Sequence, residues 1–359
     1  MSNERQEQAL IGLDGLVAEG VLAKEQAPSL RAIEARYAVR MPRGIAQRIK
    51  QGGAIGAMLA KQYVPSLAEG YQDKDEEDDP TYDEAYSPVK GVVHRYPDRV
   101  LLKPLAVCPV YCRFCFRRAR IGPKEPMLSP DDLQQAYAYI RSHKEIFDVI
   151  LTGGDPLMLG LRRLEEIITS LSSIEHIGVI RVHSRVLMAE PARMTDGMMA
   201  VFSACAKPLY LVVHCNHPAE VTQEVRVACQ RVRRTGVIVL GQSVLLKGIN
   251  DDPTTLVQLW RGMVAAGIKP YALHHLDRAP GTAHFRVGLK RGLALVEQAR
   301  AGLSGLCVPP FMVEIPRGGG KVALQVSNYR QDKDAWWLQD AQGDWHAYVD
   351  SCGDSCGES

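Results

Sequence analysis

The sequence lacks the features of a membrane protein, a secreted protein or a nucleic-acid-binding protein. No uninterrupted apolar run approaches the roughly 20 residues that span a bilayer, and the polar N-terminus does not have the shape of a signal peptide. Charge of one sign is not in excess either, because 43 Lys and Arg balance 41 Asp and Glu to give a net charge of +2. We therefore expect a cytoplasmic protein that binds neither membranes nor nucleic acid.

Cysteine is present, but it is not arranged for a disulfide framework. There are nine cysteines, an odd number, and most are scattered along the 359 residues. Three of them, Cys108, Cys112 and Cys115, fall within the stretch "AVCPVYCRFCFRR". In a reducing compartment such a cluster indicates a metal site rather than disulfides. We expect scattered cysteines such as Cys229 and Cys307 to be small buried residues.

The first part of the chain has a helical composition that is followed by an acidic run. Residues 1 to about 65 combine Ala, Leu, Glu and Arg at helical spacing, which predicts helices outside the main core. Residues 73–88, "DKDEEDDPTYDEAYSP", are densely acidic and contain two prolines. A charge run of this kind is typical of a solvated linker.

Short apolar, β-branched runs recur from residue 100 onward. They cover 100–108, 148–155, 179–185, 209–217, 237–246, 269–277 and 310–315. Amphipathic stretches such as 222–236 lie between them, at a repeat of about 30 residues that is typical of parallel βα units. Six or seven such units predict an α/β protein with a full or partial (β/α) barrel, although a doubly wound sheet would have the same periodicity.

Polar residues follow the ends of these predicted strands, where a (β/α) barrel has its reactive groups. They are Cys108, Gly153–Asp155, His183–Arg185, His214–His217, Gln242 and Asp277. We divide the chain into an N-terminal helical region with the acidic linker (1–85), a partial barrel (86–320) and a C-terminal segment (321–359). The last segment has the pattern of strands with polar turns, and we expect it to form a cover or a dimer contact.

Three thiolates on one short loop are one too few for the usual iron–sulfur or zinc site. A 4Fe–4S cluster normally has four protein thiolates, so three leave one iron open to an amino nitrogen and a carboxylate oxygen of a ligand. Two alternatives remain, a zinc ion with a distant fourth ligand and inert cysteines. Zinc is less favoured because its usual sites combine one CxxC pair with a second pair downstream.

The CxxxCxxC string after the first barrel strand, with Phe114 before its last cysteine, resembles the radical S-adenosylmethionine superfamily. The resemblance implies that the open iron chelates the methionyl part of S-adenosylmethionine and that electron transfer then releases a 5′-deoxyadenosyl radical. The stretch "LTGGDPL" resembles the glycine-rich segment that meets the methionine amino group. Gly153 and Gly154 would let the backbone approach the ligand, and Asp155 would accept from its ammonium; a simple turn is the alternative.

Lys321 follows three glycines in "EIPRGGGKVAL". A hairpin turn with an exposed lysine is one interpretation. A phosphate-binding loop is excluded, because the spacing and the hydroxyl of the GxxxxGKS/T motif are missing. A lysine on such a flexible, closely approaching backbone can instead form a Schiff base with pyridoxal phosphate.

A series of motifs gives a more specific resemblance. In chain order they are "HRYPDRVLL", "CPVYCRFCFRR", "LTGGDPL", "HCNHPAEVT", "GQSVLLKGIND", "PYALHHLD", "GTAHFR" and "GGGK". Together they resemble the lysine 2,3-aminomutases over about residues 85–335. The resemblance implies that Arg117 holds the substrate carboxylate, that Asp277 and Glu314 hold its distant ammonium, and that Lys321 carries pyridoxal phosphate. The cofactor-binding residues that it implies are Lys321, Arg95, Tyr96, Arg99, Gly153, Gly154, Asp155, Ser184, Arg185, His214 and Gln242.

The sequence also departs from the free-lysine enzymes of this family. Glu314 replaces an Asp, Gly241 stands where Asn is common, and Asp252 replaces a cysteine. Since Cys352 and Cys356 are the only other terminal candidates, we expect no structural zinc site. The stretches "HSR", "LHHLD" and "GTAHF" are similar to the branch that isomerises lysine for attachment to elongation factor P, so the chain lies between the two groups.

The resemblance implies an isomerase that moves the amino group of L-lysine from C2 to C3 and yields β-lysine. Its cofactors would be a 4Fe–4S cluster on Cys108, Cys112 and Cys115, S-adenosylmethionine and pyridoxal phosphate, with flavodoxin or ferredoxin as electron donor. Arginine or another cationic substrate, a link to elongation factor P and a homo-oligomer stay open. Glutamate is disfavoured because Asp277 and Glu314 would repel its side chain. An iron–sulfur electron carrier and a zinc-stabilised binding protein are the non-enzyme alternatives.

Overall fold

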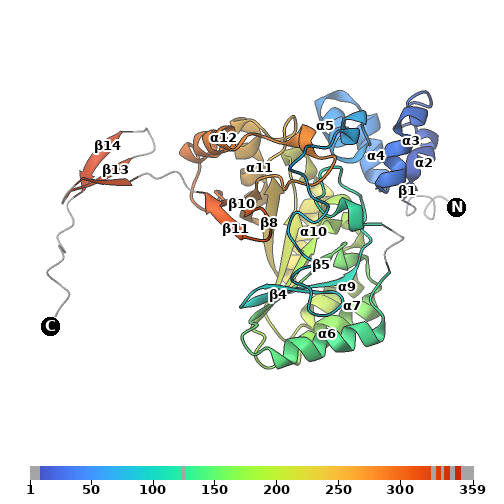
Figure 1. Ribbon diagram of the computed structural model, residues 1–359, viewed down its shortest axis with the longest axis vertical. Helices are drawn as coiled ribbons and strands as arrows, with labels where there is room; N and C mark the ends of the chain where they lie inside the picture. The colour runs from blue at the N-terminus through green and yellow to red at the C-terminus, as the bar shows by residue number, and fades with distance from the viewer. Residues whose placement is uncertain (1–8, 123–125, 325–328, 333–334, 340–343, 349–359) are drawn as a thin grey trace.

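A computed structural model of the chain describes residues 9–122, 126–324, 329–332, 335–339 and 344–348. At its centre is a nine-stranded sheet in the order β11-β10-β9-β8-β7-β6-β5-β4-β3 (Figure 1). The strands are β3 Val92–Tyr96, β4 Arg99–Leu105, β5 Asp148–Gly153, β6 Val179–Ser184, β7 Leu209–His214, β8 Ile238–Val244, β9 Lys269–His274, β10 Phe311–Ile315 and β11 Gly320–Leu324.

Strands β4 to β10 are parallel and follow one another in sequence order. Only the edge strands are antiparallel to their neighbours, β3 to β4 and β11 to β10. A doubly wound sheet would reverse its strand order at a switch point, and this sheet does not. The prediction of a partial (β/α) barrel is therefore confirmed.

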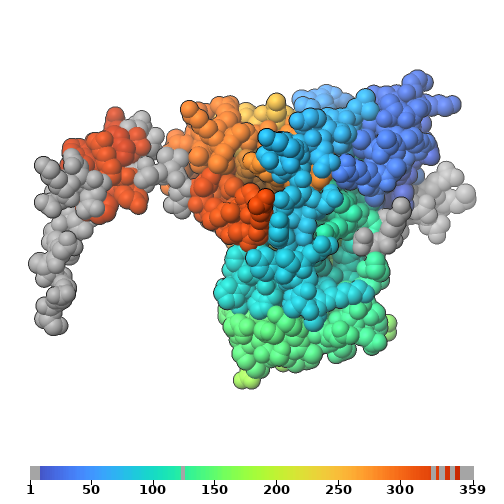
Figure 2. Space-filling view, viewed as in Figure 1, coloured from blue at the N-terminus to red at the C-terminus, as the bar shows by residue number. Residues whose placement is uncertain are grey.

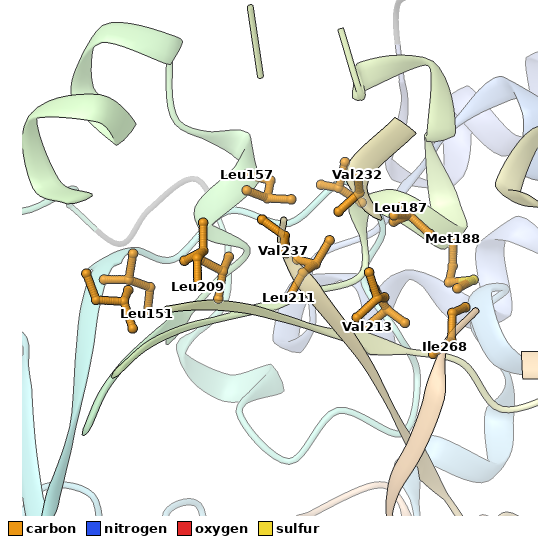
Figure 3. Close-up of a cluster of buried hydrophobic side chains, with 14 of the residues drawn as sticks. Leu151, Leu157, Leu187, Met188, Leu209, Leu211, Val213, Val232, Val237 and Ile268 are labelled. Carbon is orange, nitrogen blue, oxygen red and sulfur yellow. The ribbon is translucent and has the colours of Figure 1, made fainter. Parts of the chain in front are cut away.

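Helices cover the outer face of the parallel strands. The longer ones are α6 Pro130–Ser142, α7 Leu161–Ser172, α9 Asp196–Ser203, α10 Gln223–Arg234, α11 Pro253–Ala265 and α12 Leu289–Ala301, and the short α8 is Val186–Ala189. Figure 3 shows Leu209, Leu211 and Val213 of β7 on the side that faces Leu187 and Val232 of the helices. These side chains are buried, so alternate positions of the strand hold the helices to the barrel while the other positions are free to line its interior.

The N-terminal residues form the predicted helices, on one end of the barrel. They comprise β1 Leu10–Ile11, α2 Gly12–Ala18, α3 Ala27–Arg36, β2 Arg40–Met41, α4 Arg43–Lys50 and α5 Gly53–Tyr63. Their core is distinct from that of the barrel, but it includes Val110 and Phe114 of the cysteine loop. The helices therefore pack directly on the loop that carries the three cysteines.

The acidic run does not behave as a solvated linker, so that prediction was wrong. After the short helix η1 (Leu67–Gly70), the segment lies against the barrel, and Glu76 and Asp83 are buried. Arg286 forms an ion pair with Glu76, and Arg117 forms one with Asp83. The negative charges of the run thus neutralise cations of the barrel that lie far away in the sequence.

The C-terminal segment contains the expected strands. β12 Tyr329–Asp332, β13 Ala335–Gln339 and β14 Trp345–Tyr348 form a separate antiparallel sheet, which stands apart from the barrel (Figure 2). Cys352 and Cys356 lie outside the described residues, and the division of the chain at residues 85 and 320 stays a prediction. None of the helices described is both long and apolar enough for a membrane span.

The remaining short helical turns lie in the connections between successive barrel strands. They are η2 Arg118–Arg120, η3 Pro156–Met158, η4 Pro191–Arg193, η5 Pro218–Glu220 and η6 Ala283–Phe285.

Candidate active site

A cavity of about 850 Å³ occupies the barrel interior and extends to the cysteine loop. Nearly all residues implied by the sequence line it, which are Arg95, Tyr96, Arg99, Cys108, Cys112, Cys115, Arg117, Gly154, Asp155, Ser184, Arg185, His214, Gln242, Asp277 and Lys321. Gly153 and Glu314 are not among its lining residues. The sheet also brings residues together that are far apart in the chain: Arg95 of β3 contacts Glu314 of β10, 219 positions away.

Cys108, Cys112 and Cys115 lie on the loop after β4 and line the same cavity. Burial raises the pKa of all three thiols, that of Cys112 to about 12. Free thiolates are therefore disfavoured here, and a bound cation would reverse this. In the described part of the chain the sulfur atoms do not gather into a ready-made site for a single ion. Three half-buried thiols on one loop, lining the cavity, fit a 4Fe–4S cluster with one iron left for a ligand.

A buried ion triad anchors the cysteine loop, and sequence reasoning missed it. Nε of Arg113 donates to both carboxylate oxygens of Glu69, at 3.0 and 3.1 Å, and Arg118 donates to the same carboxylate. The Arg118 guanidinium also lies 3.7 Å from the ring centroid of Tyr37. Burial alone would raise the pKa of Glu69, but the two arginines outweigh it and lower that pKa. Glu69 thus stays charged and holds both ends of the Cys115 turn.

The glycine segment after β5 lies against the backbone of the cysteine loop. Gly153 has a φ of 101°, which favours glycine. A Cβ on Gly154 would lie 2.5 Å from the backbone nitrogen of Val107. No side chain at Gly154 fits between the glycine segment and the cysteine loop, so the backbones of these two segments lie close together. The close approach of this backbone to a ligand stays a prediction.

Asp155 ties the end of β5 to the end of β6. One oxygen accepts hydrogen bonds from the Ser184 hydroxyl at 3.1 Å and from the backbone nitrogens of Arg185 and Val186 at 2.6 and 3.0 Å. The other oxygen accepts from the backbone nitrogen of Leu157 at 3.1 Å. These protein donors satisfy most of the acceptor capacity of the carboxylate, so its role toward a methionine ammonium stays a prediction.

Arg185 is also held by protein groups. Its guanidinium donates to Tyr63 and to Glu220, and it reaches the carbonyl oxygen of His214 at 3.2 Å. Tyr63 belongs to α5, so this network joins the N-terminal helices to the barrel beside Phe114. The guanidinium therefore fixes the surroundings of the cysteine loop, while direct contact with a cofactor stays a prediction.

Three histidines from β6, β7 and β9 line the cavity, and one ring nitrogen of each has no hydrogen-bond partner among the residues that the structure describes. These atoms are Nε2 of His183, Nε2 of His214 and Nδ1 of His274. Burial lowers the pKa of His183 and of His274 to about 3, so both rings are neutral at pH 7. His214 stacks on Phe114 with the ring centroids 5.6 Å apart. His183 was predicted only as one of the polar residues at the strand ends, and His274 was not predicted; both line the cavity and can form hydrogen bonds to a ligand.

Lys321, on the edge strand β11, points between the two acids that the sequence implied. Its Nζ lies 3.1 Å from Oε2 of Glu314 and 3.4 Å from Oδ1 of Asp277. Burial alone would lower the pKa of Lys321, but the two carboxylates outweigh it and raise that pKa. If a cofactor takes up the Lys321 amine, both acids lose this ammonium and can accept another one, while Glu314 keeps its ion pair with Arg95. The residues present thus fit pyridoxal phosphate together with a cationic substrate.

Residues of β3 and of the start of β4 complete this side of the cavity and bridge the open edge of the barrel. The backbone nitrogen of Lys321 donates to the Tyr96 hydroxyl at 2.8 Å. Nη1 of Arg95 donates to Glu314 at 2.5 Å, and the Arg99 guanidinium lies 3.9 Å from the Tyr96 ring centroid. Side chains therefore join β3 to β10 and β11, although the backbones of these edge strands are not paired.

Arg117, the expected ligand of the substrate carboxylate, has an acidic neighbour that the sequence did not reveal. Its Nε and Nη2 both lie 3.0 Å from Oδ2 of Asp83, and Nζ of Lys103 lies 3.2 Å from the same oxygen. Burial alone would raise the pKa of Asp83, but Arg117 and Lys103 hold it well below its usual range. Asp83 belongs to the acidic run, whose composition predicts a solvated linker, so the sequence did not indicate that Asp83 is a residue of the site.

An open parallel barrel with three thiols on the loop after its first parallel strand defines the radical S-adenosylmethionine class of proteins. In agreement, the profile of the Radical SAM superfamily matches residues 102–259. The chain is 34% identical over 309 residues to the L-lysine 2,3-aminomutase of Escherichia coli, covering 86% of this chain and 90% of that protein. The chain belongs to the lysine 2,3-aminomutase family, as its motifs predicted.

Other relatives show how far this similarity extends. The L-lysine 2,3-aminomutase of Methanococcus maripaludis is 37% identical over 76% of this chain and 62% of its own length. The glutamate 2,3-aminomutase of Clostridioides difficile is 36% identical over 70% of this chain and 60% of its own. The chain thus spans about three-fifths of these two relatives. Family membership supports the three expected cofactors: the iron–sulfur cluster, S-adenosylmethionine and pyridoxal phosphate.

Proposed function

We propose that the protein is an isomerase, a lysine 2,3-aminomutase that depends on S-adenosylmethionine and pyridoxal phosphate and converts L-lysine to β-lysine. The observation that carries the proposal is the position of Lys321 between Asp277 and Glu314, in the cavity that the three cysteines also line. A cluster site alone would suit many radical reactions. A lysine held by two acids in the same cavity points to a cofactor aldehyde and a cationic amino acid.

The side chains of the cavity bind and orient the substrate. When bound, S-adenosylmethionine on the cluster supplies the radical that abstracts hydrogen, and pyridoxal phosphate delocalises the unpaired electron. Arg117 holds the carboxylate. Asp277 and Glu314 hold the distant ammonium once Lys321 has left them. The barrel wall excludes water and other hydrogen donors from the radical.

The charges at the two ends of the cavity select the substrate. Asp277 and Glu314 favour a cationic side chain and disfavour the carboxylate of glutamate, although one relative acts on glutamate. Arg95 already pairs with Glu314, so the net charge of this end is small and suits a single ammonium. Arginine is the alternative substrate, because both acids could accept a guanidinium.

The proposal extends to the surroundings of the reaction. A one-electron donor such as flavodoxin or ferredoxin would reduce the cluster, because each cleavage of S-adenosylmethionine to a radical needs one electron. We place the reaction in the cytoplasm, where thiols stay reduced. The β-lysine is either released or supplied for the modification of elongation factor P. The enzyme acts as a monomer or a homo-oligomer.

Substitution of Lys321 tests this proposal. Lys321→Ala should abolish formation of β-lysine and the visible absorbance of bound pyridoxal phosphate, while the iron and sulfide contents stay at the wild-type level. Lys90→Ala is a suitable control, since this lysine is 57% exposed and pairs with Asp132, which does not line the cavity. Turnover of the Lys321→Ala variant at the wild-type rate would overturn the assignment. Bound iron without any pyridoxal absorbance in the wild type would favour an electron carrier.

A further inference from the structure

We propose that Asp83 is a positioning residue for Arg117, so that the acidic segment 79–83 forms one wall of the substrate site. The inference rests on the proposed function and deepens it. Nothing in the sequence motifs assigns a role to this segment, whereas its contacts connect it to the two ends of the cavity. Oδ2 of Asp83 holds Arg117, and the carbonyl oxygen of Thr81 accepts from Nη1 of Arg95 at 3.0 Å.

Asp83 is held in place independently of Arg117. Its Oδ1 accepts from the Thr81 hydroxyl at 2.9 Å, and its backbone nitrogen donates to the Asp79 carboxylate at 3.0 Å. The Ser87 hydroxyl donates to its carbonyl oxygen at 2.6 Å. These local hydrogen bonds hold the Asp83 carboxylate without a contribution from Arg117. Asp83 is therefore a rigid acceptor and not a mobile side chain that follows the arginine.

The backbone next to Asp83 is in an unusual conformation. Tyr82 has a φ of 55°, a left-handed value that is uncommon for a residue other than glycine. A Cβ on Gly318 would lie 3.1 Å from Cβ of Tyr82 and 2.8 Å from the Tyr86 ring. The segment thus packs tightly against the glycines that precede Lys321. Strained residues persist where the surroundings determine them and cluster at functional sites, which agrees with a role in the site.

The contact geometry leaves Arg117 suited to one carboxylate. Asp83 takes the edge formed by Nε and Nη2, and no described residue accepts a hydrogen bond from Nη1. A guanidinium binds carboxylates best through two parallel N–H groups, so fixing one edge directs the remaining N–H groups into the cavity. Arg117 and Lys103 together with Asp83 carry a net charge of +1, which one α-carboxylate neutralises.

Binding measurements can isolate the carboxylate. The protein is loaded anaerobically with cluster and pyridoxal phosphate, S-adenosylmethionine is omitted so that no turnover occurs, and calorimetry compares L-lysine with 1,5-diaminopentane. The diamine keeps both amines and lacks only the carboxylate. Wild type should prefer L-lysine. Asp83→Asn should weaken L-lysine binding about tenfold or more, the loss expected for a misplaced charge-assisted hydrogen bond, and leave diamine binding within about twofold.

A matched control and a second variant make the test decisive. Glu84→Gln removes a neighbouring charge whose side chain is 75% exposed and pairs with Arg120, and it should bind both ligands as wild type does. Asp83→Glu keeps the buried charge, so it should fold even if Asp83→Asn does not. Its longer side chain displaces the guanidinium and should reduce the preference for L-lysine by a smaller factor.

The outcomes separate this inference from the proposed function. Unchanged or tighter L-lysine binding by both Asp83 variants would overturn the role of Asp83 and leave the proposed function standing. A wild-type protein that binds L-lysine no better than the diamine would overturn the carboxylate site at Arg117 itself, and the positioning role with it. Selective loss of L-lysine binding in the Asp83 variants, with Glu84→Gln unaffected, would support the inference.

Discussion

Glu69→Gln is the substitution that tests how the cysteine loop is held. The Glu69 side chain is fully buried, and those of Arg113 and Arg118 are 2% and 5% exposed. Its two oxygens accept from both guanidinium groups and from the backbone nitrogen of Ser66. A glutamine keeps the shape but loses the charge and turns an N–H donor toward arginine donors. Two buried cations then face no anion.

The expected cost follows from the burial. Removing one partner of a buried ion pair destabilises a protein by about 3–5 kcal/mol, which is a large share of the about 5–15 kcal/mol of a typical folded domain. We expect the free energy of unfolding of the cluster-free protein to fall by about this amount in chemical denaturation. The variant should also take up less iron and sulfide on anaerobic reconstitution, because the turn after Cys112 loses its anchor.

An exposed ion pair provides the control. Glu84→Gln breaks the contact with Arg120, where the glutamate is largely exposed, and such pairs contribute about 0–1 kcal/mol. The reasoning would be refuted if Glu69→Gln unfolded within about 1 kcal/mol of wild type and bound a full complement of iron. The triad would then be dispensable, and packing of the N-terminal helices on the loop would hold the cysteines instead.

Two further predictions concern the cavity. Gly154→Ala should lower the iron content after reconstitution, because its Cβ would meet the backbone of Val107. Gly262→Ala is the control, since it has open space around it and should keep the wild-type iron content. Equal iron contents in the two variants would contradict this prediction. Burial lowers the pKa of His183 and His274 to about 3. Below about pH 6.5 these two histidines therefore bind protons in the unfolded chain but not in the folded protein. The free energy of unfolding should accordingly fall as the pH drops from about 6.5 toward 3. Replacing both histidines with Phe should flatten this dependence in denaturation measured across that range, and an unchanged slope would count against it.

Local patterns predicted the barrel and much of its site. Strands that are buried in a parallel sheet have continuous apolar sequences, so β4 to β10 could be predicted from the apolar runs. The spacing of Cys108, Cys112 and Cys115 and the glycines before Lys321 are also local signals. The resemblance to a family then supplied Asp277 and Glu314, which the structure brings to Lys321.

Pairings between distant residues could not be predicted in this way. A dense acidic run has the same composition whether water or arginines surround it, so Asp83 looked like part of a linker. Glu69 gave no signal, because its partner Arg113 is 44 residues away. His274 becomes a site residue only once the strands close around one cavity. Such contacts depend on tertiary structure and not on a motif.

The most direct test of the account is an anaerobic assay of the reconstituted protein with dithionite, S-adenosylmethionine, pyridoxal phosphate and L-lysine, with products separated by chromatography and identified by mass. We predict β-lysine, formed only when all components are present. Formation of 5′-deoxyadenosine without β-lysine would contradict the proposed substrate while leaving the radical chemistry intact, and arginine would be tested next.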